Sequence, residues 1–183
     1  MKNHIISALR LTFVMLIIVG IYSGIVYAGS KLLPTQGNAE IIHYKGQKFY
    51  TNIGQDFKSS KYFHGRPSAV DYNAAGSAGS NKGPSNEEYL EKVQKRIDTL
   101  KMQNPGMENT KVPVELVTAS GSGLDPDISE DGAMYQVNRI SKMRNISAGQ
   151  LENLIQKHTE KSLFGPSKVN VLKLNIALDN LKQ

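Results

Sequence analysis

The sequence predicts an α+β protein in which one N-terminal transmembrane helix precedes a single small soluble domain of mixed helices and strands. An uncharged apolar run at residues 11–28 predicts the membrane helix. After it, apolar residues first alternate and later recur at intervals of three and four, but the two patterns do not interleave as in a βαβ chain. The 183 residues suffice for a membrane segment and one domain of about 150 residues.

Residues 11–28 (LTFVMLIIVGIYSGIVYA) are long enough to cross a membrane. With a rise of about 1.5 Å per residue, a helix of this length spans about 27 Å, close to a hydrocarbon core of ~30 Å. Gly20 and Gly24 form a G-x-x-x-G pair that lets another membrane helix approach closely, although glycine is common in membrane helices generally. A cleaved signal peptide is the alternative, since residues 26–28 (VYA) resemble a cleavage site, but the run exceeds the usual length of a signal core.

The charges before this run predict its orientation. Lys2 and Arg10 precede it, and positive residues favour the cytoplasmic side of a membrane. Residues 1–10 are therefore predicted to stay in the cytoplasm and residues 29–39 to form a connector. Residues 40–183 then form an extracytoplasmic domain.

The domain is predicted to contain one β-hairpin, one further strand and four helices. The hairpin pairs residues 40–44 with residues 47–53, and the further strand is residues 112–118 (VPVELVT). Residues 71–86 are rich in Gly, Ser, Asn and Ala and predict a loop. Three helices are predicted to begin at the capping serines Ser85, Ser129 and Ser147. A fourth helix follows a Gly-Pro break, and its first apolar residue is Val171.

Composition excludes several classes of protein. Apart from Lys2 and Arg10, the chain has 20 basic and 16 acidic residues with the signs interspersed. This charge is too mild and scattered for a nucleic-acid-binding face. The chain has no cysteine, which excludes disulfides, thiolate catalysis and thiolate metal sites. Its histidines are scattered singly, without a recognisable metal-binding spacing.

The segment ISAGQ at residues 146–150 is similar to L-S-G-G-Q, the nucleotide-sensing signature of ABC transporter ATPases. Ser147 and Gln150 also fit a capping box, in which each side chain bonds the other residue's backbone at a helix start. Ser147, Gly149 and Gln150 could instead contact phosphate there. The chain has no phosphate-binding G-x-x-x-x-G-K-[ST] loop, so the sequence favours the cap, and any ATP contact would need another protein.

Residues 62–68 (YFHGRPS) concentrate aromatic and basic side chains. His64 could act as a base and Arg66 as an anion clamp, but the sequence assigns no carboxylate partner to either. A packed, hydrogen-bonded turn or a partner contact through Phe63, His64 and Arg66 is favoured over catalysis. With no complete active site in the sequence, we predict a protein that is not an enzyme by itself.

Taken together, these residues are similar to one known family. The blocks concerned are residues 53–57, 62–69 (YFHGRPSA), 79–81, 83–86, 112–120 (VPVELVTAS), 123–125, 144–145, 174–175 and 177–179, with Ser147 and Gln150. In content and order they resemble the C chain of the bacterial Kdp potassium-transporting ATPase, the KdpC family. The resemblance covers nearly the whole chain, although Ile146 stands where the family often has Leu.

The resemblance implies a non-catalytic subunit of a high-affinity ATP-driven potassium uptake pump in the bacterial inner membrane. Its implied partners are a potassium-conducting subunit, a P-type ATP-hydrolysing subunit and a small membrane subunit. The C chain is implied to stabilise the complex and to act as a catalytic chaperone that raises the ATP affinity of the hydrolysing subunit. Ser147, Gly149 and Gln150 would assist nucleotide binding, with ATP shared and no cofactor of the chain's own.

The predicted orientation conflicts with direct ATP contact, because it puts Gln150 outside the cell. The hypothesis that reconciles them is a domain that caps the outer face of the potassium-conducting subunit and affects ATP affinity allosterically. The alternative is a secreted or anchored extracytoplasmic binding module without a role in ATP use.

Overall fold

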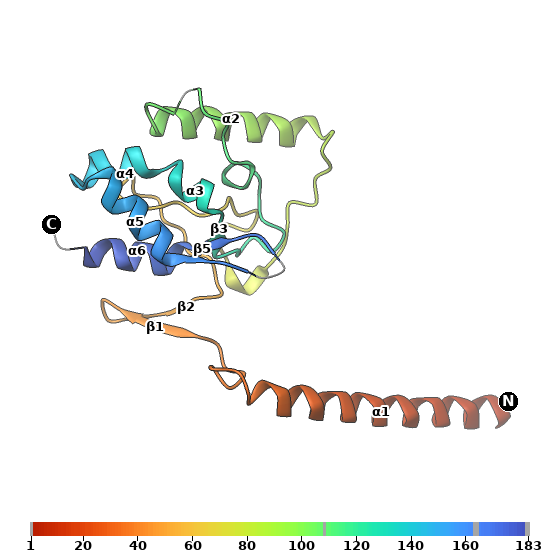
Figure 1. Ribbon diagram of the computed structural model, residues 1–183. Helices are drawn as coiled ribbons and strands as arrows, with labels where there is room; N and C mark the ends of the chain where they lie inside the picture. Colours follow the sequence, from red (N-terminus) through yellow and green to blue (C-terminus); the bar gives the residue numbers. More distant parts are fainter. Residues whose placement is uncertain (1, 108, 163–164, 182–183) are drawn as a thin grey trace. The chain divides into compact units, whose positions relative to one another are not determined.

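The computed structural model describes residues 2–107, 109–162 and 165–181. Its contacts divide the chain into two units, Met1–Glu40 and Ile41–Gln183 (Figure 1). The second unit combines helices with two small antiparallel sheets, so the predicted α+β class is confirmed.

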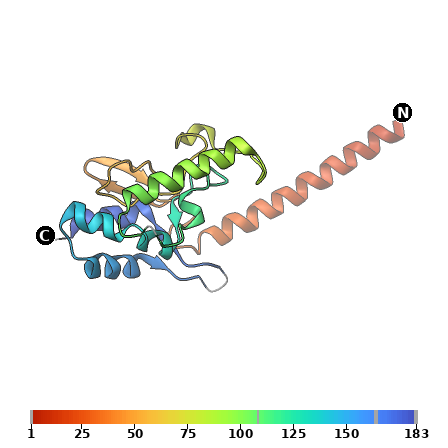
Figure 2. The same cartoon turned by 90° about the horizontal axis from the view of Figure 1, so that it is seen from above.

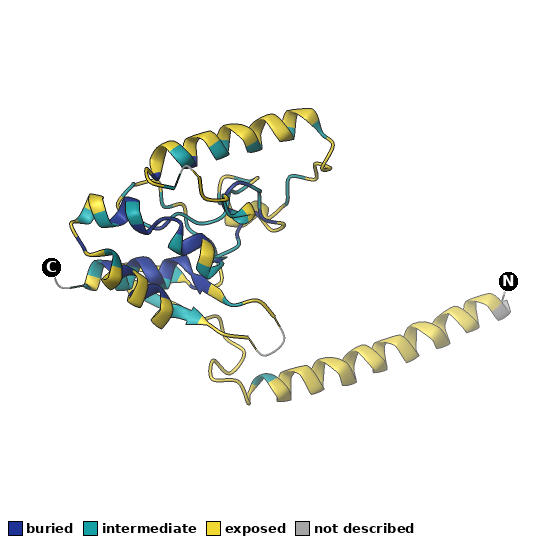
Figure 3. Ribbon diagram, turned by 45° about the horizontal axis from the view of Figure 1, so that its top comes forward, coloured by how far each residue is buried: buried dark blue, intermediate teal, exposed yellow. Residues whose placement is uncertain are grey.

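The first unit is dominated by helix α1, Lys2–Ser30. Its segment His4–Ser30 contains a stretch of 18 residues with a mean hydropathy of 2.3 and no buried part, and it is long and apolar enough to cross a membrane. Figure 3 shows the helix exposed along almost its whole length. A Cβ atom added at Gly20 or Gly24 would meet nothing within 4 Å, so both glycines leave open space beside the helix.

The second unit opens with a hairpin of β1 (Ile41–Tyr44) and β2 (Gln47–Tyr50). The strands are antiparallel, with Ile41 opposite Tyr50. Lys45 and Gly46 both have positive φ, of 48° and 78°, as a two-residue turn matching the twist of a hairpin requires. The predicted hairpin is confirmed, but its second strand ends at Tyr50 rather than at residue 53.

A second sheet was not predicted from the sequence. It has the order β3-β5-β4, with all neighbours antiparallel: β3 is Asp127–Ile128, β4 is Thr159–Glu160 and β5 is Lys168–Asn170. Strands of two or three residues are too short to carry a readable alternation.

Helices α3, α5 and α6 pack against strand β5 of this sheet, and α5 also packs against α3, α4 and α6 (Figures 1 and 2). Their bounds are α2 Glu87–Gln103, α3 Glu130–Met134, α4 Val137–Arg144, α5 Ala148–His158 and α6 Val171–Asn180, with 3-10 turns η1 at Ala74–Gly76 and η2 at Val114–Leu116. The predicted caps at Ser129 and Ser147 are confirmed, since each serine accepts a backbone N–H of the first turn.

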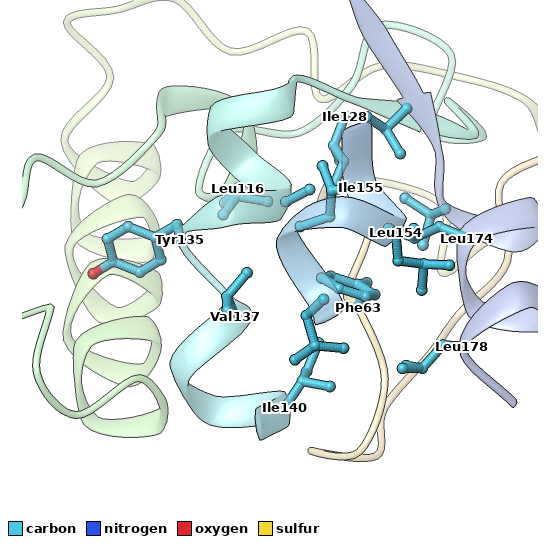
Figure 4. Close-up of a cluster of buried hydrophobic side chains, with 14 of the residues drawn as sticks. Phe63, Leu116, Ile128, Tyr135, Val137, Ile140, Leu154, Ile155, Leu174 and Leu178 are labelled. Carbon is cyan, nitrogen blue, oxygen red and sulfur yellow. The ribbon is translucent and has the colours of Figure 1, made fainter. Parts of the chain in front are cut away.

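The core lies between α4, α5, α6 and the chain around Phe63. Phe63, Ile140, Leu151, Ile155 and Leu174 have no exposed surface. Figure 4 shows the Phe63 ring among aliphatic side chains from these helices. Full burial of each such side chain is worth about 1.5–3 kcal/mol, so this cluster is the main source of the domain's stability.

Three local predictions were wrong. Residues 112–118 are not a strand: the chain turns after Pro113 into η2, where the N–H of Leu116 donates to Pro113 and that of Thr118 to Val114. The β-branched composition suggested a strand, but backbone groups that bond locally need no neighbouring strand.

The other two concern helix ends. Helix α2 is capped by Asn86, whose Oδ1 accepts the N–H of Tyr89, and not by Ser85. The helix predicted after Ser129 is interrupted between Met134 and Val137.

Candidate functional site

The segment at residues 62–64 belongs to no helix or strand. Its buried backbone is bonded instead by side-chain amides. The Oδ1 atom of Asn175 accepts the N–H of Phe63 at 2.9 Å, and its Nδ2 donates to the Phe63 carbonyl at 2.9 Å. One amide from α6 thus satisfies both backbone groups of Phe63, as a neighbouring strand would.

Gln136 does the same for the next residue. Its Oε1 accepts the N–H of His64 at 2.8 Å, and its Nε2 donates to the His64 carbonyl at 3.1 Å. Gln136 is fully buried and lies just before α4, where the predicted long helix is interrupted. The two amides hold residues 63 and 64 from both sides, and we call this arrangement the amide clamp.

A buried arginine extends the amide clamp. Arg139, on α4, is only 3% exposed. Its guanidinium donates to the carbonyls of Ser60 and Tyr62, to Asn104 Oδ1 and to Gln136 Oε1. Burial lowers its pKa to about 10, which keeps it charged at neutral pH. Neutral oxygen dipoles therefore solvate this buried cation.

His64 and Arg66 are both engaged inside the domain. The His64 Nε2 lies 3.0 Å from the Ser59 carbonyl, a contact that requires the proton on that nitrogen. Burial, with the charge of Arg139 as a second cause, lowers the pKa of His64 below its ordinary value. Arg66 Nη1 lies 2.9 Å from Asp125 Oδ2, so Arg66 has the carboxylate partner that the sequence could not assign.

The predicted partner contact through Phe63 does not fit its position. Phe63 has no exposed surface and belongs to the core. Of the alternatives for residues 62–68, the packed and hydrogen-bonded turn describes Phe63; contact with a partner stays a prediction for His64 and Arg66.

Blocks of sequence that lie far apart meet beside this segment. The N–H of Gly54 donates to the Leu124 carbonyl at 2.7 Å, and that of Ser120 donates to the Pro67 carbonyl at 3.0 Å. A Cβ at position 54 would lie 2.6 Å from the Asp125 carbonyl oxygen, so only glycine fits there. These blocks therefore form one packed body.

Asp179, near the end of α6, joins four other side chains. Its Oδ2 accepts from Tyr44, Lys45 and Tyr62, and its Oδ1 accepts from Arg144 at 2.6 Å. Burial alone would raise the pKa of Asp179, but these four hydrogen bonds outweigh burial and hold the pKa well below its usual range. The Asp179 cluster ties the hairpin to the ends of α4 and α6, and no local pattern in the sequence indicates it.

An open groove of about 430 Å³ lies beside His64, between α2 and residues 56–67. Lys58, Lys95 and Arg96 line it with His64, and Asp56 is the carboxylate among the lining residues. Among the residues that the structure describes, no three His, Cys, Asp or Glu side chains come together to hold a metal ion. The amide clamp, Arg139 and the Arg66–Asp125 pair are suited to holding segments of the chain in place.

The start of α5 is a capping box. The Ser147 Oγ accepts the N–H of Gln150 at 3.3 Å, and the Gln150 Oε1 accepts the N–H of Ser147 at 3.3 Å and its hydroxyl at 2.9 Å. Gly149 between them is exposed, and a Cβ there would meet nothing within 4 Å. The predicted cap is confirmed, whereas a contact of these residues with phosphate stays a prediction.

Comparison with known proteins identifies the family. Residues 5–180 match the family described as "K+-transporting ATPase, c chain" (KdpC). The chain belongs to the KdpC family. It is 52% identical to the KdpC subunit of the potassium-transporting ATPase of Flavobacterium johnsoniae, 49% identical to that of Flavobacterium psychrophilum and 42% identical to that of Methylococcus capsulatus. Each of these matches covers 100% of both chains.

The amide clamp of this KdpC chain can be tested by removing one amide. Asn175→Ala leaves the N–H and carbonyl of buried Phe63 unpaired, and we expect a loss of about 2–4 kcal/mol in the free energy of unfolding. The measurement is urea unfolding of the full chain in detergent, followed by circular dichroism. Asn153→Ala is the matched control, since Asn153 is exposed on α5 and should change stability by less than ~0.5 kcal/mol. Equal losses in the two variants would contradict the clamp.

The Asp179 cluster makes stability depend on pH. Because the pKa of Asp179 is lower in the folded than in the unfolded chain, its contribution is complete above about pH 5 and is lost as the pH falls through about 4 and below. We expect Asp179→Asn to be less stable than the wild type at neutral pH, and the difference to shrink in acid. Unfolding in urea at several pH values measures it. Asp98→Asn, at an exposed position of α2, is the control, and a gap for Asp179→Asn that is independent of pH would contradict the assignment.

Proposed function

We propose that this chain is the non-catalytic accessory subunit of a high-affinity ATP-driven potassium uptake pump in the bacterial inner membrane. The observation that carries the proposal is the match to the K+-transporting ATPase C chains over residues 5–180, which includes both the apolar helix and the domain. Its partners are then a potassium-conducting subunit, a P-type ATP-hydrolysing subunit and a small membrane subunit.

In this proposal α1 is a retained membrane anchor with its N-terminus in the cytoplasm. Lys2 and Arg10 precede the predicted span, whereas residues 29–40 contain one basic residue, Lys31. This difference favours an extracytoplasmic domain by the positive-inside rule. Gly20 and Gly24 then offer a place where a helix of a partner subunit packs closely, because neither glycine carries a side chain that would hold the backbones apart.

The domain's contribution is to stabilise the complex and to raise the ATP affinity of the hydrolysing subunit as a catalytic chaperone. It acts from the outer face of the potassium-conducting subunit, and its effect on ATP is allosteric. Such an effect requires contacts that differ between the ATP-bound and ATP-free states of the pump. The capping box supports an indirect effect, since the Ser147 hydroxyl and the Gln150 Oε1 are already bonded to each other and to the backbone.

The orientation is tested by labelling single cysteines, because the chain has none of its own. Glu152→Cys places a thiol at an exposed position of α5 without touching the cap. We expect a membrane-impermeant maleimide to label it in intact cells. His4→Cys, at the other end of α1, is the matched control and should be labelled only after permeabilisation. The reverse result would place the domain in the cytoplasm and overturn the proposed orientation.

The role of residues 147–150 is tested with two alanine variants of the chain in the assembled pump. Ser147→Ala removes the cap and should lower the free energy of unfolding by about 1 kcal/mol. Gly149→Ala fills open space on a helix, so it should not lower stability and should leave the KM for ATP unchanged. A several-fold rise in KM for ATP with Gly149→Ala alone would support direct nucleotide contact. A pump whose KM for ATP is the same with and without the chain would favour the alternative, an anchored binding module without a role in ATP use.

A further inference from the structure

The chain that follows α1 is folded back rather than extended. Five backbone hydrogen bonds link residues 28–38 in consecutive turns: from Lys31 to Ala28, Leu32 to Gly29, Leu33 to Ser30, Gln36 to Leu33 and Asn38 to Thr35. Gly37 has a φ of 81°, and a Cβ there would lie 2.8 Å from the Ser30 Oγ. The turn at residues 31–38 therefore returns to the end of the helix, and we call it the juxtamembrane turn.

Two leucines project from the juxtamembrane turn. Leu32 is 88% exposed and Leu33 is 55% exposed. A single exposed leucine on a protein surface needs no explanation. Here two adjacent leucines are held outward by a hydrogen-bonded turn that begins where an apolar helix ends. The exposure of both leucines at this position is explained if they face the membrane.

The residues beside the leucines have the chemistry of a membrane interface. Tyr27, on the last turn of α1, is 66% exposed, and the Lys31 ammonium lies 4.8 Å from the centre of its ring. Tyrosine is enriched where a helix leaves the hydrocarbon, and lysine there extends its charge toward the headgroups. Lys31 directly precedes Leu32, and Tyr27 precedes it by five residues.

The length of α1 places the juxtamembrane turn near the outer edge of the hydrocarbon core. If Leu11 marks the inner edge of the hydrocarbon, a helix with a rise of about 1.5 Å per residue brings Tyr27 to about 24 Å and Ser30 to about 28 Å from it. The outer edge of a core of ~30 Å thus falls at the juxtamembrane turn. Because the turn returns to Ser30, Leu32 and Leu33 stay at this depth.

We infer that the juxtamembrane turn is an interfacial anchor, in which Leu32 and Leu33 insert into the lipid at the boundary between headgroups and acyl chains. Lys31 stays with the headgroups. The partner of this surface is the lipid bilayer, and the inference rests on the proposed membrane-spanning role of α1. The anchor limits how far α1 can slide along the membrane normal, because outward movement exposes the two leucines to water and inward movement carries the Lys31 charge into the hydrocarbon.

The test places an environment-sensitive fluorophore on single cysteines of the full-length chain, labelled before reconstitution with its partner subunits in liposomes. Leu32→Cys and Leu33→Cys each keep the other leucine. Thr35→Cys, in the same turn, is the matched control. We expect nitroxide lipids labelled near the headgroup to quench the probes at positions 32 and 33 at least about threefold more than the probe at 35. Iodide in the water should quench the probe at 35 most.

Two results would overturn the inference. Weak quenching by lipid at positions 32 and 33, together with iodide quenching as strong as at position 35, would mean that the leucines face water. Protection of positions 32 and 33 from both lipid and iodide would mean that a partner subunit covers them. A probe at Leu16→Cys, in the middle of α1, separates this failure from that of the proposed function, since loss of quenching there by nitroxides deep in the bilayer would show that α1 does not span the membrane.

Discussion

The packing of this domain depends on how the backbone of residues 63 and 64 is satisfied. The N–H and C=O groups of a buried segment are normally bonded within a helix or a sheet. Here Asn175, on α6, and Gln136, just before α4, supply those bonds, and Phe63 can therefore fill the centre of a core made mostly of helices. Each amide has a donor and an acceptor at the spacing of a peptide group, so neither can be replaced by a residue with only one of them. The same hydrogen bonds therefore fix the position of residues 63 and 64 and the positions of α4 and α6.

Residues that look reactive in the sequence are hydrogen-bonded within the domain. His64 and Arg66 lie in a motif dense in polar and aromatic groups, yet each is bonded within the domain, to a carbonyl and to Asp125. The similarity of residues 146–150 to an ATPase signature likewise coincides with a formed capping box. In both cases the polar groups of a short motif are hydrogen-bonded within the domain.

Local signals in the sequence were enough for features whose cause is local. The apolar run, the hairpin turn at Lys45 and Gly46 and the serine caps each depend on a few consecutive residues, and each was predicted. The amide clamp joins residues more than 70 positions apart, and the Asp179 cluster joins the hairpin to α6 across more than 130 positions, so no periodicity connects them. The strand predicted at residues 112–118 failed for a related reason, since β-branched residues describe a preference that only a neighbouring strand can realise. Family resemblance, which carries long-range information, gave the expectation of a Kdp subunit.

The distances along the chain between bonded residues bear on how this protein is made. Tyr44 and Tyr62 bond to Asp179, which follows them by 135 and 117 residues. Phe63 bonds to Asn175, which follows it by 112 residues. A ribosome releases the chain from its N-terminus, so the first strands emerge long before the last helix that completes them. Contacts of such long range slow folding. During synthesis the backbone of Phe63 therefore lacks its bonds to Asn175 until α6 has left the ribosome, and this part of the core cannot form before then.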